Sequence, residues 1–475
     1  MPSDQATVTN PFEASYIGPM RIVTLLLAFV CAARLDAQST VAPASAGQQR
    51  VRGVVLISID GLKPEYVLEA NARGLKIPTL RAMVARGAYA RGVVGVVPTV
   101  TYPSHTTLVT GTAPARHGIV ANNTFDPLNR NQGGWYWYAR DIRVPTLWDA
   151  MTDARRTVGN VHWPVTVGAR ITWNLPQYWR SGEADDRKLV AALSSPGLYD
   201  SLERELGIPY ADGKDESLEG DERRARFAER MIETRRPALM LAYFTALDHE
   251  QHEHGPFSAE AATTLERLDV VIGSLARAAQ RAYGDDGAVI AVVSDHGFMR
   301  TSRALNLIHA LRNAGLVTTS EDAPDRPTAW RAMVWSAGGS AAVVVNDSSV
   351  ALRDSLGRLL RSLSADTANG IERVVDRAGL ARIGGFPSAA YLVNMREGFF
   401  VGSNIRGPLV REVSPGGTHG YLPDAPAMYA SFFLVGPTIP PGRDLGVIDQ
   451  RSIAPTLARL LGVRLPAAEV PALLP

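Results

Sequence analysis

The chain has 475 residues, of which 46% are hydrophobic and 20% are charged, and its formal net charge at pH 7 is +2. These proportions are typical of a globular protein with a sizeable core. The small net charge gives no support for a nucleic acid or an acidic surface as a partner, so we expect no nucleic-acid-binding surface.

The first part of the chain has the pattern of a targeting segment. A short basic start at Met20 is followed by the apolar run IVTLLLAFVCAA, which is too short to cross a membrane and is typical of a signal peptide cleaved after Ala37. We therefore expect an upstream extension and signal peptide over residues 1–37, a flexible lead-in over 38–50, and a periplasmic or secreted protein whose mature part has no transmembrane segment. The single cysteine, Cys31, lies in the signal, so any metal in the mature chain must be held by His and Asp.

Three nearly continuous apolar runs indicate strands that are buried on both faces, as in a parallel sheet. They are VVLISI (54–59), ALMLAYFTAL (238–247) and AVIAVVS (288–294). Helical patterns separate or flank them at 78–86, 146–154, 219–235 and 259–283. This alternation predicts an α/β fold with a doubly wound, mostly parallel sheet flanked by helices.

The pattern changes between residues 299 and 417. The strand-like segments SAAVVVN, AAYLVNM and GFFVG and a helix around 355–363 predict a smaller α+β insertion. The chain then returns through GGTHGY, a strand at SFFLVG and a final helix near 453–461. We therefore expect a catalytic core formed by 51–298 and 418–465, interrupted by an inserted subdomain over 299–417.

Each of the three apolar runs is followed by an aspartate: Asp60, Asp248 and Asp295. Ligands of open α/β sheets bind beyond the carboxyl ends of the strands, so these side chains are expected at one edge. Each of them alone could instead cap a helix or a turn.

Histidines accompany these aspartates in a pattern that suits a metal. Asp248 and His252 are four residues apart, which is one turn if the segment is helical, and His296 follows Asp295 directly. Such ligands suit Zn²⁺, with Mn²⁺ or Fe as alternatives. The full set is Asp60, Asp248, Asp295, His252, His296 and His419. Split between two ions, it leaves each ion open positions, as catalytic sites require, and two ions about 4 Å apart can clamp an in-line phosphoryl displacement.

The segment PTVTYPSHTTLVTG (98–111) supplies a hydroxyl for such a reaction. Pro103 suits the first position of a helix, which places Thr101 just ahead of a helix N-terminus, where an anionic group is favoured. Thr101 could be a cap, a phosphate ligand or a nucleophile. Beside a pair of metal ions, it favours a phosphate-ester hydrolase with a covalent phospho-threonine intermediate.

Six ordered motifs between about Val51 and Leu461 resemble those of the type I phosphodiesterase/nucleotide pyrophosphatase family of the alkaline phosphatase superfamily. SIDGLKPEYV resembles the first metal motif of the family, PTVTYPSHTTLVTG its nucleophile motif, and ARHGIVANNTFDP the segment that follows. ALDHEQHEHGP, VVSDHGF and GGTHGY resemble its later metal motifs, in the same order. The resemblance implies an alkaline phosphatase-like fold.

The resemblance also assigns roles to residues. One zinc would be held by Asp248, His252 and His419, and the other by Asp60, Asp295 and His296. Thr101 would face the second ion as the nucleophile and would be a further metal ligand. Asn122 would bind a non-bridging phosphate oxygen, and Tyr102 would lie beside the leaving group or base. Ser104 departs from the family, because many nucleotide-directed members have asparagine there.

The sequence thus predicts an exported dizinc hydrolase of small-molecule phosphate diesters, nucleotides among the candidate substrates. The first alternative is a phosphomonoesterase of the same superfamily, which usually needs an additional cation for the extra charge of a monoester. The second is a non-catalytic exported binding protein with the same fold. The aromatic residues Trp135, Tyr136, Trp137 and Tyr138 either stack on a substrate or belong to the core.

Overall fold

The fold is seen in a computed structural model that describes residues 51–131, 133–180, 185–211, 213–285, 287–347 and 349–474. The predicted extension, signal peptide and lead-in lie outside the described residues. Among the residues that are described, no helix has both the length and the apolar character needed to cross a membrane.

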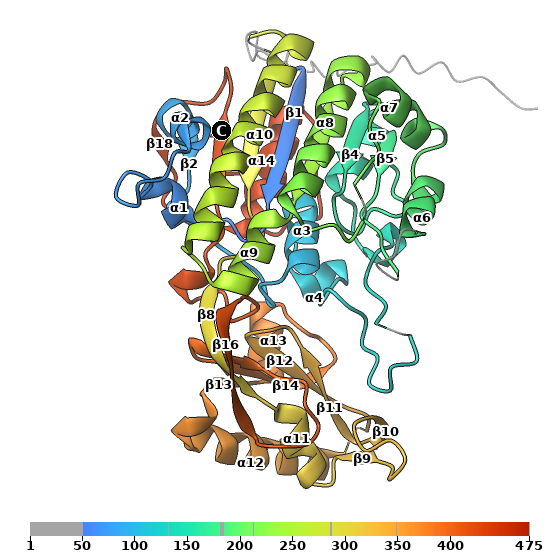
Figure 1. Cartoon of the computed structure of the whole chain (residues 1–475), viewed down its shortest axis with the longest axis vertical. Helices are drawn as coiled ribbons and strands as arrows, with labels where there is room; N and C mark the ends of the chain where they lie inside the picture. The colour runs from blue at the N-terminus through green and yellow to red at the C-terminus, as the bar shows by residue number, and fades with distance from the viewer. Residues whose placement is uncertain are drawn as a thin grey trace, which may run out of the picture. The chain divides into compact units, whose positions relative to one another are not determined.

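An eight-stranded sheet forms the centre of the fold, with the strand order β18-β2-β17-β7-β1-β6-β4-β5 (Figure 1). Neighbouring strands are parallel except where β17 pairs with β7 and β2. The strands are β1 (Gly53–Ile59), β2 (Ala88–Tyr89), β4 (Val158–Val161), β5 (Trp173–Leu175), β6 (Leu239–Phe244), β7 (Ala288–Val293), β17 (Phe432–Val435) and β18 (Arg443–Asp444). The predicted mostly parallel α/β sheet is confirmed.

Helices cover both faces of this sheet because its central strand is apolar on both sides. In β1, Val55, Ile57 and Ile59 pack with α2, α8 and α10, whereas Val54 and Leu56 pack with α3, α5 and α14. The helices of the first face are α2 (Pro78–Arg86), α8 (Leu218–Arg235) and α10 (Ala259–Tyr283), and those of the second are α3 (Thr101–Thr110), α5 (Leu147–Asp153) and α14 (Ile453–Leu461). This two-sided packing is the doubly wound arrangement that the sequence predicts.

The register of the central strands brings their carboxyl ends together. Ile59 of β1 pairs with Phe244 of β6, and Ser58 pairs with Val293 of β7. The residues that follow each strand therefore emerge at the same edge of the sheet. Asp60 lies one residue after the end of β1, and Asp295 lies two residues after the end of β7. Helix α9 (Ala246–His254) begins at the same edge, two residues after the end of β6.

A second group of strands lies between β7 and β17 in the chain. A four-stranded antiparallel sheet has the order β11-β12-β14-β13, and a three-stranded sheet has the order β15-β8-β16. AAYLVNM and GFFVG are both strands, but as β14 and β15 they lie in different sheets and do not pair. The elements here are β8 (Met299–Leu305), α11 (Leu307–Asn313), β9 (Val317–Thr319), β10 (Pro327–Trp330), β11 (Ala332–Ser336), β12 (Ser340–Val345), α12 (Val350–Ala365), β13 (Ile371–Asp376), α13 (Arg377–Ile383), β14 (Ala389–Met395), β15 (Gly398–Val401) and β16 (Val410–Thr418).

The predicted boundary between core and insertion stays a prediction, because all described residues belong to one compact unit. Strands β8 and β16, which begin and end the predicted insertion, pair antiparallel, with Met299 opposite Thr418.

The remaining elements are α1 (Pro64–Leu68), β3 (Gly92–Val94), α4 (Pro114–His117), α6 (Asp186–Leu193), α7 (Leu198–Leu206), β19 (Val447–Asp449) and the 3-10 turns Ala139–Asp141, Thr367–Asn369, Pro426–Met428 and Gln450–Ser452.

Candidate active site

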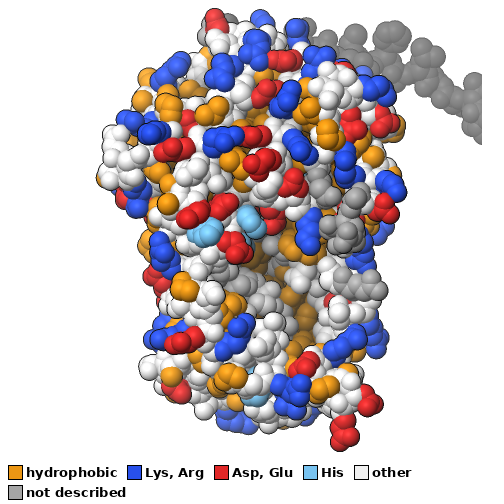
Figure 2. Space-filling model, in the orientation of Figure 1, with side chains coloured by type: hydrophobic (Ala, Val, Ile, Leu, Met, Phe, Trp, Pro, Cys, Tyr) orange, Lys and Arg blue, Asp and Glu red, His pale blue; other side chains and the backbone are white. Residues whose placement is uncertain are grey.

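Helix α9 presents the first group of candidate metal ligands. Asp248 and His252 lie one turn apart on it, and Nε2 of His252 is 3.2 Å from Oδ2 of Asp248. His419, from the segment after β16, places its Nε2 3.8 Å from Oδ1 of Asp248. The apolar run 238–247 is therefore not all strand, since β6 ends at Phe244 and the helix has begun by Ala246. At the surface over α9, histidine and acidic side chains gather together (Figure 2).

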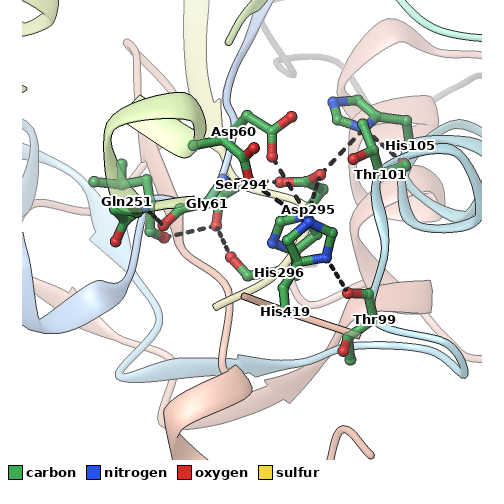
Figure 3. A network of polar contacts seen from close by, with 12 residues as sticks. Asp60, Gly61, Thr99, Thr101, His105, Gln251, Ser294, Asp295, His296 and His419 are labelled. Carbon is green, nitrogen blue, oxygen red and sulfur yellow. Dashed lines mark hydrogen bonds and ion pairs between the residues drawn. The ribbon is translucent and has the colours of Figure 1, made fainter. Parts of the chain in front are cut away.

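His296 is the centre of the second group. Its Nε2 is 3.4 Å from Oδ1 of Asp60 and 3.1 Å from Oδ2 of Asp295, and both carboxylates face its ring in Figure 3. Ligand atoms of Asp60, Asp248 and His296 all lie within 4.8 Å of one another, as do those of Asp248, His252 and His419. Asp248 thus belongs to both groups, which the sequence did not indicate, whereas Asp295 joins the second group through His296.

The three histidines are held so that each presents Nε2 to the site. Nδ1 of His252 lies 3.0 Å from the carbonyl oxygen of Gly417, and Nδ1 of His419 lies 3.2 Å from that of Thr99. His296 faces the carbonyl of Gly297 in the same way, at 3.2 Å. Since a carbonyl oxygen only accepts, Nδ1 of each ring carries a proton in this contact, and Nε2 is the atom that each ring in its neutral form offers to a metal. Histidine ligands of metals are commonly oriented by such contacts.

Several polar atoms of the site have no hydrogen-bond partner within the described part of the chain, although they lie close to one another. They include Oδ1 of Asp60, Oδ1 of Asp248, Oδ2 of Asp295 and Nε2 of His296, all of them buried. Buried polar atoms without a partner are costly, and together they form a cation-binding arrangement of oxygen and nitrogen donors. The residues therefore fit one or two divalent metal ions.

The pKa values of the three carboxylates also favour a bound cation. Burial raises the pKa of Asp295 to about 7, and burial together with repulsion from Asp248 and Asp295 raises the pKa of Asp60 well above its ordinary value. Burial also raises the pKa of Asp248, but His252 and His419 outweigh it and leave the value below normal. A divalent cation would neutralise this repulsion and favour the ionised carboxylates.

Thr101 is the first residue of α3, with Val100 as the N-cap. The prediction that the helix starts at Pro103 is therefore wrong by one half-turn, because the chain already adopts helical geometry at Thr101. The side chain of His105 ties this turn to the metal ligands: its Nδ1 is 2.8 Å from the carbonyl oxygen of Thr101 and 3.6 Å from Oδ2 of Asp295. Thr101 itself is 8% exposed and lies beside these groups in Figure 3.

Asn122 lies next to the first turn of α3. The backbone N–H of Tyr102 donates to Oδ1 of Asn122 at 2.8 Å, which leaves the amide NH₂ of Asn122 as a donor. The Tyr102 side chain is only 1% exposed and packs edge-on against Trp135, with 5.2 Å between ring centroids. The backbone of Tyr102 contacts Asn122, whereas its ring packs against Trp135. A contact between this ring and a substrate stays a prediction. Trp137 is buried in the core.

Three residues of this region escaped the sequence analysis as site components. The hydroxyl of Tyr243, inside β6, donates to Oδ2 of Asp60. His105 accepts at Nε2 from the Ser58 hydroxyl, 2.9 Å away, and burial lowers its pKa to about 3. Trp163 packs edge-on against the His105 ring, with 4.9 Å between ring centroids, and so supports the first turn of α3 through His105. An apolar strand and a lone histidine carry no local signal for such roles.

Curated relatives match part of the chain. A pyrophosphatase/phosphodiesterase of Schizosaccharomyces pombe, itself uncharacterised, is 28% identical over 253 residues, which make up 52% of this chain and 45% of that protein. Human ectonucleotide pyrophosphatase/phosphodiesterase family member 5 is 26% identical over 285 residues, or 58% of this chain and 50% of that protein. The matched regions thus span half or less of these relatives.

Solved structures share the fold over most of the chain. Murine ectonucleotide pyrophosphatase/phosphodiesterase 5, in an inactive variant with alanine in place of a threonine and in complex with AMP, superposes with a TM-score of 0.62 at 19% identity, covering 89% of this chain and 96% of that one. The human counterpart gives 0.60 at 18% identity, covering 87% and 95%. A family model described as type I phosphodiesterase/nucleotide pyrophosphatase matches residues 54–422. The chain therefore belongs to the type I phosphodiesterase/nucleotide pyrophosphatase family of the alkaline phosphatase superfamily.

Proposed function

We propose that the protein is an exported hydrolase of small-molecule phosphate diesters that uses two zinc ions and the hydroxyl of Thr101. The observation that carries this proposal is the pair of ligand groups that share Asp248, next to the first turn of α3. One zinc would be held by Asp248, His252 and His419, and the other by Asp60, Asp295 and His296. Bound zinc would supply Lewis-acid stabilisation of the charge on the reacting oxygens.

The chain's own residues account for the two steps of the reaction. Oγ1 of Thr101 forms a bond to phosphorus while the bond from phosphorus to the leaving oxygen breaks, and the hydroxyl proton passes to solvent. Water then forms a bond to phosphorus as the bond to Thr101 breaks, which releases a phosphate monoester and restores the threonine. The NH₂ group of Asn122 donates to a non-bridging oxygen, where negative charge is placed in both steps.

A diester is favoured over a monoester by the charges around the site. Within the described part of the chain, no ion pair joins a lysine or an arginine to any of the six proposed ligands. The nearby Lys63 donates instead to the backbone carbonyls of Phe298 and Ala427. Among the described residues, the extra negative charge of a monoester therefore meets no lysine or arginine that is paired with the proposed ligands. A nucleotide diester fits the proposal, since a relative of the same fold was solved with AMP.

Export follows from the targeting pattern at the start of the chain. The basic residue after Met20 and the apolar run that follows it support a signal peptide. Cleavage of the signal peptide would also remove Cys31, the single cysteine. The exported chain would then bind zinc through His and Asp side chains.

Turnover of bis-p-nitrophenyl phosphate and p-nitrophenyl phosphate tests this function directly. We expect a higher kcat/KM for the diester, loss of activity with a chelator, and recovery when zinc is added. Metal analysis of the active protein should find two zinc ions per chain. A higher kcat/KM for the monoester would favour the phosphomonoesterase, and binding of zinc without turnover of either ester would favour a non-catalytic binding protein.

Replacing Asn122 with alanine should lower kcat by about 10²- to 10³-fold, because one donor to the transition-state oxygen is lost. The neighbouring Asn123 provides a matched control, since it pairs with Trp135 in an isolated β-bridge. Kinetics of both variants on the same diester check this prediction. Equal kcat in N122A and N123A would exclude the assigned role.

A further inference from the structure

A buried ion pair outside the ligand set holds the start of the helix that carries Asp248 and His252. Asp221 and Arg224, both on α8, are 0% exposed, and Nη1 of Arg224 donates to Oδ1 of Asp221 at 2.9 Å. Neither residue is a proposed ligand or nucleophile. A buried ion pair is weak evidence for stability by itself, so its other contacts decide what it does.

The Asp221 carboxylate acts as the cap of α9. It accepts the backbone N–H of Thr245 at 2.9 Å and that of Ala246 at 2.8 Å. The N-cap residue Thr245 makes no capping bond of its own through its side chain. The first turn of α9 therefore takes its cap from another helix, and a negative charge at that end also suits the helix dipole.

Arg224 fixes the carboxylate in turn. Its Nη1 also lies 3.4 Å from the Thr245 hydroxyl, and its Nη2 donates to the carbonyl of Asp215. The guanidinium thus joins α8, the start of α9 and the segment that precedes α8. A planar donor of this kind holds several acceptors in one fixed geometry.

The consequence for the metal site follows from the length of α9. The helix has nine residues, too few for a stable helix in isolation, and Asp248 lies in its first turn. Anything that sets the position of Thr245 and Ala246 also sets the direction of both ligand side chains on this helix. The other zinc would take Asp60, Asp295 and His296 from the segments after β1 and β7, and Asp248 is the residue of α9 that belongs to both groups.

We infer that Asp221, held by Arg224, is a positioning residue that orients α9 for the zinc ion of Asp248, His252 and His419. This role rests on the proposed function, since it concerns one of the two proposed ions. It goes beyond that function in ranking the two ions: loss of the Asp221 carboxylate should weaken this ion more than the other, because the other ion shares only Asp248 with α9.

The chain offers a matched control in a second buried cap. Asp269, on α10, is 1% exposed and accepts the backbone N–H of Thr79 at 2.9 Å and of Leu80 at 2.7 Å, at the start of α2. The capping of two backbone N–H groups is the same, but α2 carries no proposed ligand. Asp221→Asn should cost more stability than Asp269→Asn, because it also leaves the buried Arg224 without its carboxylate. The two variants should differ further in metal binding, which the loss of a cap alone does not change.

Zinc affinity of the full chain, measured by competition with a chromophoric chelator, tests the inference. In D221N we expect the zinc ion of Asp248, His252 and His419 to bind about 10- to 100-fold more weakly, the usual effect of losing a group that orients ligands. The other ion should lose less affinity, because it shares only Asp248 with α9. The absorption spectrum of the cobalt-substituted protein should change in D221N and not in D269N. Two zinc ions bound by D221N as by the wild type would overturn the inference alone, and a wild type that binds no zinc would overturn the proposed function with it.

Hydrogen exchange in the wild type keeps the inference testable if D221N does not fold. Zinc should slow exchange of the Thr245 and Ala246 amides, because metal and cap hold the same helix. The Thr79 and Leu80 amides, capped by Asp269, should change less. Equal changes at the two caps would contradict the proposed coupling.

Discussion

Replacing Thr101 with alanine should lower kcat for a phosphate diester by at least about 10³-fold, because the variant has no hydroxyl to form the covalent intermediate. The structure places Thr101 at the start of α3, tied through His105 to Asp295. Zinc content should stay at two ions per chain, since the six proposed Asp and His ligands remain in this variant. Steady-state kinetics and metal analysis of T101A check both parts.

Two further variants separate the loss of a nucleophile from general damage to the helix. Thr101→Ser keeps a hydroxyl and should retain part of the activity. Thr106, on the same helix, donates its hydroxyl to the Tyr102 carbonyl at 2.8 Å, so T106A loses a buried hydrogen bond without losing the nucleophile. An unchanged rate in T101A, or an equal loss in T106A, would remove Thr101 from its proposed role.

Replacing Asp248 with asparagine should cost at least about 10³-fold in kcat/KM and should also remove zinc, because a ligand carboxylate of the cation pair is lost. Asp248 is the one side chain that belongs to both ligand groups. Its carboxylate also faces His252 and His419, so the variant loses the charge that balances two ligand rings. Zinc content and diester kinetics of D248N are the measurements.

The same helix supplies the control for this variant. Glu250 is two residues further on, and its Oε2 lies 3.7 Å from Nε2 of His254, away from the ligand groups. Glu250→Gln removes a carboxylate from α9 and should leave zinc content and kcat/KM unchanged. Equal losses in D248N and E250Q would point to the helix as a whole rather than to a metal ligand.

The strands whose ends carry the candidate ligands could be predicted, because strands buried on both faces have continuous apolar sequences. Asp60 and Asp295 follow β1 and β7 as expected, and Asp248 and His252 lie one turn apart as their spacing predicts. The boundary of β6 was less predictable: ALMLAYFTAL is apolar throughout, and only the backbone shows that the strand stops at Phe244. Apolar character alone does not separate the end of a buried strand from the start of a buried helix.

The supporting residues could not be predicted, because their roles depend on which elements are neighbours. Tyr243 reaches Asp60 because β6 lies beside β1 with Ser58 opposite Tyr243. Asp221 caps a helix that starts 25 positions later in the chain. This pairing is set by the packing of α8 against β6 and α9. In the sequence, Asp221 belongs to a charged segment that looks like an ordinary solvent-facing helix surface.

The antiparallel pair β8/β16 closes the segment of chain that lies between His296 and His419. Its first strand begins just after His296 and its second ends just before His419, with Met299 opposite Thr418. The backbone pairing of these two strands sets the spacing between His296 and His419. A change of length in the polypeptide between the strands would leave this pairing in place, and with it the two proposed histidine ligands.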